Sequence, residues 1–499
     1  MTRKLQIAGG VAIIALAALL AVAWIVLNGA PGQRWAREKF IARLEQMTGG
    51  HVELGQFQLR PLERAIDIQR VTLSRRSEAS SSGSTAGVAS AQNQTPWLQA
   101  ERLHAQLTFW SLLGSDMGLE SLVIEKPLVQ VTIDADGNNN LPRPEGGTNG
   151  DLFRVWIESL EARDGTLLVN ERSLPLQVRA EGVRAQLAST SAQEYRGSVE
   201  TENAAVQYGQ GSQSGSGALR FTAKPERVEI ESATWSSGES RLEATGTITN
   251  YADPQVELAY SATFQASGMA QVAQFTNLRS GAVQLTGNAK YRGGEFDTQG
   301  KLLLRNSEWR SGGVRVRNLN GGVDYSIDPQ RVSFSNVFFS VLGGTVTGSV
   351  EVQDWRSSQS SPGRQRGSAN LRVANIGLHN AATAAASRQF PVDRLSLSGV
   401  TSGAVEVRWT GAPNSAVAKF DLGVKPLPAR GARPEFDGQS RDFVLGGSAT
   451  GSYFFASDRL HFESLDLSGP SLQLNLTGVL GTREADARLT VRTSDAGEL

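Results

Sequence analysis

The sequence predicts a mainly β protein in which an N-terminal transmembrane helix precedes a long, curved antiparallel β-sheet with short interspersed helices. Three observations predict it. An apolar run near the N-terminus contains no charged residue. After this run, apolar and polar residues alternate with period two in many short segments. The composition, with 53 Gly but only 17 Pro and 4 Met in 499 residues, is typical of twisted sheet with tight turns.

Composition also excludes several classes of function. The 49 basic and 49 acidic residues balance, so no net field favours nucleic acid. The chain has no Cys, which removes thiol catalysis, disulfides and thiolate metal sites. No two histidines lie within four residues of each other, so a helical zinc pair is absent: His51, His104, His379 and His461. We expect no cofactor, no metal and no enzymatic activity.

The membrane anchor is predicted within residues 1–30. Residues 7–27 read IAGGVAIIALAALLAVAWIVL and as a helix would extend for about 31 Å, close to the thickness of a bilayer core. The predicted membrane-spanning residues include Ile7, Ile13, Leu20, Trp24 and Leu27. Arg3 and Lys4 favour a cytoplasmic N-terminus, and the long chain that follows is expected to be translocated across the membrane. A cleaved signal peptide is the alternative, against which stand the length of the run and Asn28 at its exit.

A short amphipathic helix is predicted directly after the anchor, in RWAREKFIARLEQMTGG. Phe40, Leu44 and Met47 share one face at spacings of i, i+4 and i+7, and Trp35 is suited to the membrane interface. Gly49 and Gly50 end the helix. We expect this helix to cover the start of the sheet.

The first β region is predicted over residues 31–187, together with this helix. The period changes to two in HVELGQFQL, and the alternation continues in AIDIQRVTL, LQAERLHAQLTF and LVIEKPLVQVTI. Residues 77–95 lack any period and are rich in Ser and Ala, so we expect a disordered insertion between two strands.

Residues 188–499 are predicted to form a repetitive antiparallel sheet. Residues 227–238, 331–343 and 459–469 share an Arg, alternating apolar residues and a glycine turn, and each is followed by a strand with its own glycine. The segments SGAVQLTG and SGAVEVRWTG also match, and each follows a short helical pattern. The spacing predicts one unit, a short helix followed by a meander, about every 120 residues.

A possible calcium loop occurs in IDADGNNN. Its oxygen-bearing side chains have the spacing of an EF-hand loop: Asp134, Asp136, Asn138, Asn140 and Glu145. However, the approach is a predicted strand, Asn139 replaces the required Gly, and Pro142 and Pro144 obstruct an exiting helix. We therefore predict a strand-ending turn without calcium.

The apolar side of so long a sheet needs a cover, and the sequence contains too little helix to supply one. The sheet either closes on itself as a sandwich or stays open as a curved groove. Residues predicted to line the groove are Val283, Leu285, Val314, Val316, Tyr325, Ile327, Val332, Phe334, Val346, Val350 and Val352. A lipid with two chains of about sixteen carbons faces a barrier on the order of 20 kcal/mol in water, which an apolar groove removes.

The order of these parts resembles the AsmA-like proteins, and most closely the TamB group of bacterial envelope proteins. The similarity lies in the anchor, the helix ending in MTGG, the strand HVELGQFQL, the segment LESLVIEKPLVQVTIDADGNNNLP, and the turns SGAVQLTG and LGGTVTGSVEV. The resemblance implies an inner-membrane anchor, a periplasmic taco-shaped sheet with a lipid-sized groove, and a role in moving phospholipids toward the outer membrane or in assembling outer-membrane proteins.

Three functions remain open at this point. The first is a membrane-anchored conduit for phospholipids. The second is an assembly factor that offers a sheet edge or groove to an outer-membrane barrel protein. The third is a β-repeat adhesin or stalk with a closed core. We find no catalytic constellation, and GQGSQS lacks the third glycine and the helix of a dinucleotide loop.

Overall fold

The computed structural model describes residues 29–75, 95–108, 118–134, 139–141, 156–172, 176–191, 193–209, 211–250, 254–266, 277–311, 314–358, 364–385, 397–427, 443–470, 472–481 and 485–493. Twenty-four of its strands belong to one sheet, and β19 (Leu397–Ser398) and β22 (Phe443–Val444) form a separate parallel pair. The described residues contain few helices, and all but the 19-residue α2 are short. The prediction of a mainly β protein with a many-stranded sheet and interspersed helices is confirmed.

The contacts divide the chain into two units, each described by itself. Unit 1 comprises Met1–Gly238, Glu243–Glu257 and Arg292–Gly294, and unit 2 comprises Glu239–Leu242, Leu258–Tyr291 and Glu295–Leu499. Strands β11 (Ser240–Thr249) and β12 (Gln255–Gln265) contribute residues to both units.

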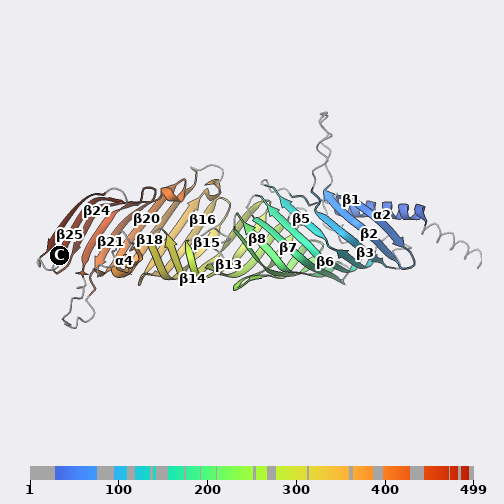
Figure 1. The fold of residues 1–499 in the computed structure, drawn as a ribbon, viewed down its shortest axis with the longest axis horizontal. Helices are drawn as coiled ribbons and strands as arrows, with labels where there is room; N and C mark the ends of the chain where they lie inside the picture. Colours follow the sequence, from blue (N-terminus) through green and yellow to red (C-terminus); the bar gives the residue numbers. More distant parts are fainter. Residues whose placement is uncertain are drawn as a thin grey trace, which may run out of the picture. The chain divides into compact units, whose positions relative to one another are not determined.

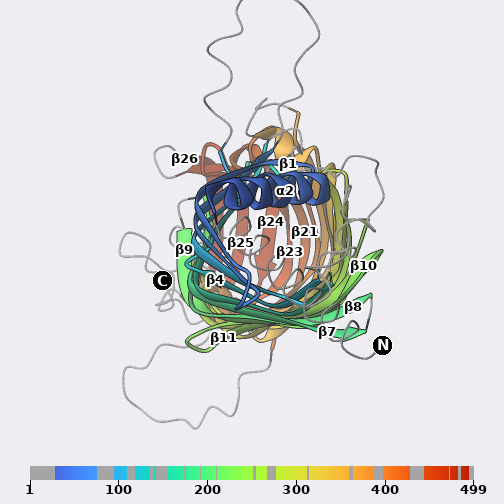
Figure 2. The ribbon, with the colours of Figure 1, turned by 90° about the vertical axis from the view of Figure 1, so that its right-hand side faces the viewer.

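The described part of unit 1 starts with helix α2 (Ala30–Thr48) and continues with a sheet that bends round from it (Figure 2). Its strands are β1 (Gly50–Arg60), β2 (Ala65–Arg75), β3 (Leu98–Leu107), β4 (Gly118–Glu125), β5 (Leu128–Ile133), β6 (Trp156–Glu171), β7 (Leu176–Ser191), β8 (Glu194–Tyr208), β9 (Gly211–Lys224) and β10 (Arg227–Ser237).

Helix α2 covers the apolar side of the first strands, as predicted. Phe40 is 5% exposed and belongs to a core cluster with Val52, Ile68, Ala105 and further residues of β1 to β4. Leu44 packs against the same cluster, whereas Trp35 is exposed. The helix ends at Gly49, whose φ of 67° is left-handed, and the N–H of Gly49 donates to the carbonyl of Glu45.

One pairing in unit 1 differs from the expected antiparallel pattern. β6 runs parallel to β4 and to β5, with Leu160 opposite Leu122 and Leu167 opposite Val129. The connection from β5 to β6, residues 134–155, is long enough for the crossover that a parallel neighbour requires. Alternation along a strand defines its faces but carries no information on its direction, so the sequence pattern missed this crossover.

Unit 2 contains a meander of long strands that follow one another in chain order (Figure 1). They are β13 (Leu278–Arg292), β14 (Glu295–Ser311), β15 (Val314–Ile327), β16 (Arg331–Val341), β17 (Gly344–Gln353), β18 (Arg366–Gly377), β20 (Val400–Thr410), β21 (Val417–Lys425), β23 (Gly446–Phe454), β24 (Arg459–Ser468), β25 (Leu472–Gly481) and β26 (Ala485–Thr493). The short helices are η3 (Trp355–Ser358), α4 (Leu378–Ala385) and η5 (Pro413–Ser415). Each described pairing from β14 to β26 in this sheet is antiparallel.

The three sequence repeats coincide with strands β10, β16 and β24, and each of these strands contains a β-bulge at the same place. The register shifts directly after Ile230, Phe334 and Phe462, which occupy the third position after the Arg of each copy. Gly348 and Gly478 lie opposite the last two bulges and have φ of 149° and 116°, values that favour glycine. Gly348 and Gly478 thus allow the partner strand to adopt the backbone conformation needed opposite each bulge. Bulges of this kind locally increase the twist of the strand.

The expected turns and one expected helix of the repeat are present. Asp328 Oδ1 accepts hydrogen bonds from the backbone N–H groups of Gln330 and Arg331, both at 2.8 Å, and so closes the turn between β15 and β16. Helix α4 (Leu378–Ala385) lies within the pattern GLHNAATAAASRQF, and β19 and β20 follow it in the chain.

Several expectations fall outside the described residues. These are the anchor with Ile7, Ile13, Leu20, Trp24 and Leu27, almost all of the 77–95 insertion, and the helical pattern ending at Phe275. Within the part of the chain that the structure describes, none of the helices has the length and apolarity needed to cross a bilayer.

Candidate functional site

A continuous apolar face covers one side of the unit 2 sheet from β15 to β26. Because side chains alternate between the two sides of a strand, residues paired in register share a side. One row of partners is Tyr325, Phe334, Val350, Ala369, Val407, Ala418, Tyr453, Leu460 and Leu480. A second is Phe339, Val346, Val373, Gly403, Leu422, Ala449, Leu465, Leu476 and Leu489. We call this side the apolar face.

The opposite side of the same strands is polar. Its register row is Ser349, Asn370, Glu406, Lys419, Ser452 and His461. Ion pairs on this side include Arg331 with Glu351 at 3.4 Å. A sheet with one solvated side and one apolar side is expected to bury the apolar side against another layer or a ligand.

The apolar face lacks a packed cover within the described residues. Single residues of the apolar face are buried, among them Ala369, Ala418 and Ala449, but the described residues form only two hydrophobic clusters: the one beneath α2, and a small one of Ala266, Leu278 and Val283 with Leu302 and Leu304 packed against it. Neither cluster extends beyond Leu304, and Phe334, Phe420 and Phe462 are only partly buried. The described structure therefore has no closed sandwich core over β16 to β26.

Several aromatic side chains of this face lie over a glycine of the neighbouring strand. Tyr325 pairs with Gly300, Trp409 with Gly367 and Phe420 with Gly451. A Cβ at any of these glycines would collide with the ring or hydroxyl of its partner, at 2.8 Å from Phe420 Cζ in the case of Gly451. The rings consequently lie low on the sheet rather than projecting from it.

Nine of the predicted groove residues, from Val314 to Val352, lie on this face, whereas Val283 and Leu285 lie on β13, outside it, and the exposure of the eleven residues differs. Val283, Val316 and Tyr325 are buried, at 2%, 8% and 5% exposed, so they serve packing within the sheet. Val314 is 38% exposed at the start of β15. The others are partly buried: Leu285, Ile327, Val332, Phe334, Val346, Val350 and Val352. Val314 and Val316 lie an odd number of positions before Tyr325, which in a regular strand would place them on the opposite side. The bulge at Asn318, whose φ is 56°, restores them to the side of Tyr325.

Sequence reasoning missed the continuation of the face beyond Val352. Leu371, Val405, Phe420 and Phe462 follow in register, and the same period-two alternation in their strands could have identified them. It also missed a polar contact on this face. The hydroxyl of Tyr325 lies 2.5 Å from that of Tyr260, and burial, followed by this hydrogen bond, raises the pKa of Tyr325.

The segment IDADGNNN is a strand-ending turn at its described residues. The side chain of Asn140 accepts from the N–H of Thr132 at 2.9 Å and donates to the carbonyl of Gln130 at 2.8 Å. The carbonyl of Asn139, which occupies the position where an EF-hand loop requires Gly, accepts from Arg75 Nη1 at 2.9 Å. The Asn140 amide is thus committed to the backbone of β5, which fits the turn rather than an EF-hand loop. Groups of side chains suited to a metal ion are absent from the described residues.

No protein-family model matches the sequence, and no curated protein matches it. The apolar face and its register are therefore the main basis for a functional proposal.

Proposed function

We propose that the protein is a membrane-anchored envelope protein whose apolar face shields acyl chains and conducts phospholipids between the inner and outer membranes. In this proposal the N-terminal segment anchors the chain in the bacterial inner membrane and the bulk of the chain is periplasmic. No catalytic step is required, because the apolar face only provides a non-polar environment for the acyl chains. The resemblance to AsmA-like proteins of the TamB group supports the same reading.

The observation that carries the proposal is the continuity of the apolar face. Ten neighbouring strands share it: β15 to β18, β20, β21 and β23 to β26. At about 4.8 Å between strands the face is about 43 Å wide. One leaflet of a bilayer core is about 15 Å deep, so the face is large enough for extended acyl chains.

Energetics favour an apolar occupant. Partly buried Phe and Leu side chains leave apolar area in contact with water, and each CH₂ of an acyl chain gains about 0.8 kcal/mol when it leaves water. A lipid tail on this face thus reduces two exposed apolar surfaces at once. The polar opposite side, with Glu406 and Lys419, keeps the sheet soluble along its length.

The proposal is tested by lipid loading of the purified full chain. Phe334→Lys places a charge on the apolar face at a partly buried position, and we expect it to abolish co-purification of phospholipid in native mass spectrometry. Ser333→Lys is the matched control, because Ser333 neighbours Phe334 on the same strand but faces the polar side, opposite Glu351. This control is expected to load lipid normally.

Circular dichroism and thermal unfolding will show whether Phe334→Lys retains the fold. If Phe334→Lys unfolds the sheet, the position belongs to a closed core and the stalk interpretation gains support. If the wild-type chain carries no lipid and Phe334→Lys behaves like Ser333→Lys, the conduit is excluded.

A second candidate is an assembly factor for outer-membrane barrel proteins, and the edge strand β26 favours it. β26 pairs with β25 on one side, and no other described strand pairs with it. Leu489 is 60% exposed and Val491 39% exposed. Unpaired backbone groups on such an edge can accept another strand. Adding a β-hairpin of a barrel precursor should slow amide hydrogen exchange in β26, and unchanged exchange would exclude strand addition there.

A further inference from the structure

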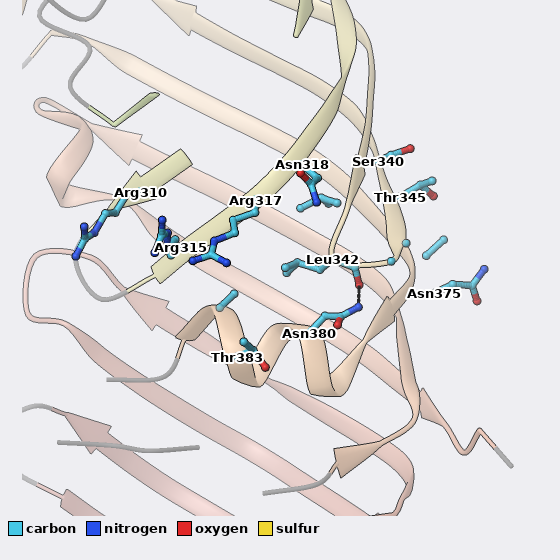
Figure 3. A pocket seen from close by; sticks show the side chains of 15 residues that line it. Arg310, Arg315, Arg317, Asn318, Ser340, Leu342, Thr345, Asn375, Asn380 and Thr383 are labelled. Carbon is cyan, nitrogen blue, oxygen red and sulfur yellow. Dashed lines mark hydrogen bonds between the residues drawn. The ribbon is translucent and has the colours of Figure 1, made fainter. Parts of the chain in front are cut away.

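A second distinctive feature of unit 2 is a pocket at one end of its strands. Its volume is about 910 Å³, and it lies where β14 ends, β15 begins, the β16–β17 turn projects and α4 passes (Figure 3). We call it the arginine pocket, because Arg310, Arg315 and Arg317 line it. In Figure 3 these side chains lie on one side of the hollow, with Asn380 and Thr383 of α4 on the other.

The charge in the arginine pocket is unbalanced. Arg310 and Arg315 are directly opposite each other in the β14–β15 register, an arrangement that costs stability unless an anion is near. Glu308 meets Arg315 through two hydrogen bonds, from Nε to Oε1 at 2.6 Å and from Nη2 to Oε2 at 3.1 Å. Among the described residues no carboxylate pairs with Arg310 or Arg317, and the residues that line the pocket include no Asp or Glu.

All three guanidinium groups of the pocket lower the pKa of Glu308. The hydrogen bond from Arg315 is the main cause that lowers the pKa of Glu308, and the charges of Arg315, Arg317 and Arg310 act in the same direction. One carboxylate therefore serves three cations, and about two positive charges remain for a ligand.

The remaining wall of the pocket is uncharged and mixes polar side chains with apolar ones such as Val341, Leu342 and Ala384. It includes the hydroxyl side chains of Ser340, Thr345 and Thr383 and the amides of Asn318 and Asn375. Asn380 is fixed on α4 by a hydrogen bond of 3.0 Å from its Nδ2 to the carbonyl of Leu342. Guanidinium groups match the geometry of phosphate oxygens, and hydroxyl and amide groups can donate to those that remain.

We propose that the arginine pocket binds a phosphate group, carried either by a lipid headgroup or by a soluble phosphate compound. The pocket itself is independent of the acyl-shielding function. Only the assignment of the phosphate to a lipid headgroup rests on that proposed function. A headgroup bound here would sit at the end of β15, whose apolar residues begin with Val314 and Val316 on the other side of the strand.

The test uses the full chain and the double variant Arg310→Gln/Arg317→Gln, which leaves the Arg315–Glu308 pair intact. Inorganic phosphate is titrated by calorimetry, and vesicles of phosphatidylcholine with or without phosphatidylglycerol are tested by co-sedimentation. We expect affinity for phosphate or for phosphatidylglycerol vesicles to fall about 10-fold or more in the variant. Arg366→Gln/Arg372→Gln is the matched control, because both residues lie on β18 of the same unit, outside the pocket.

The outcomes separate the sources of the phosphate. Binding of inorganic phosphate that also displaces the vesicles indicates a site for any phosphate, whereas vesicle binding that excess phosphate does not displace indicates a lipid headgroup. Equal losses in the two double variants, or no binding of either probe to the wild-type chain, would overturn the proposal. Phe334 does not line the arginine pocket, so Phe334→Lys should lose acyl loading and retain phosphate binding. Phosphate binding without any acyl loading in the wild type would refute the conduit and support the phosphate site.

Discussion

The phenyl rings of Phe420 and Phe462 meet edge to face across strand β23, with centroids 6.0 Å apart and ring planes at 79°. Gly451 of β23 is the register partner of both residues. The two rings approach each other only because the strand between them carries no side chain at this position.

Replacing Gly451 by Ala will therefore destabilise the protein by about 1–3 kcal/mol, since the new Cβ would lie 2.8 Å from Phe420 Cζ and overlap the backbone of β24. Urea denaturation followed by circular dichroism measures the change. Gly423→Ala is the control, because its Cβ would meet nothing closer than the Ser402 carbonyl at 3.7 Å. Equal losses in both variants would show that the ring packing is not responsible.

A second prediction concerns the stability of variants at the bulge in β16. Asn336 has a φ of 50°, and its Nδ2 donates to Asp324 Oδ2 at 2.7 Å. Asn336→Val will lower the free energy of unfolding by about 1–2 kcal/mol, because a β-branched residue is strained in a left-handed conformation. Asn336→Gly relieves that strain and should cost less, so the difference between the two variants measures the backbone contribution. Equal stability of the two variants would argue against a left-handed residue in solution.

A third prediction concerns the contribution of Tyr453 to stability at alkaline pH. Its hydroxyl donates to Asp458 Oδ1 at 2.5 Å, and this hydrogen bond, with burial, raises the pKa of Tyr453 from 10.0 to about 12. A raised tyrosine pKa favours the neutral phenol in the folded state. Its contribution to stability is thus fully present below pH 10 and is lost as pH rises from 10 to 12.

Titration of the phenolate absorbance checks this expectation. Tyr453→Phe should remove one late-titrating group, and Asp458→Asn should move the pKa of Tyr453 back toward its ordinary value. An unchanged titration curve in both variants would show that the contact does not persist in solution.

A fourth prediction concerns the contribution of the Glu308–Arg315 pair to stability at acidic pH. The hydrogen bond from Arg315 lowers the pKa of Glu308 below its ordinary value of 4.5. The stability from this pair is present above the unfolded pKa and is lost as pH falls through the folded pKa. Carboxyl-carbon NMR should report a lowered midpoint in the wild type and a higher one in Arg315→Gln. A midpoint unaffected by this substitution would contradict the two hydrogen bonds.

Alternation along the chain was sufficient to predict the strands and the sides that they bury. In β1 the pattern HVELGQFQL places Val52, Leu54 and Leu59 in the core, and the structure buries all three. The helix that covers them was also predictable, because Phe40 and Leu44 recur at helical spacing. These features depend on neighbours in sequence, which is why a local pattern reveals them.

Features that depend on distant partners were not predictable in this way. Asn318 and Asn336 look like ordinary polar positions of a strand, although both have left-handed backbones at bulges. Arg315 and Arg317 look like solvated residues until the fold brings α4 beside them. The parallel direction of β6 depends on a crossover, and period-two patterning is the same in either direction.

Rings that rest on facing glycines couple two sites that are far apart in the chain. Gly367 and Trp409, for example, belong to β18 and β20 and are register partners. A larger residue at the glycine becomes tolerable only once the ring has been replaced by something small, so the two positions should covary among homologues. Such coupled changes would report strand register directly from sequences, even where the pairing itself is too weakly patterned to be recognised.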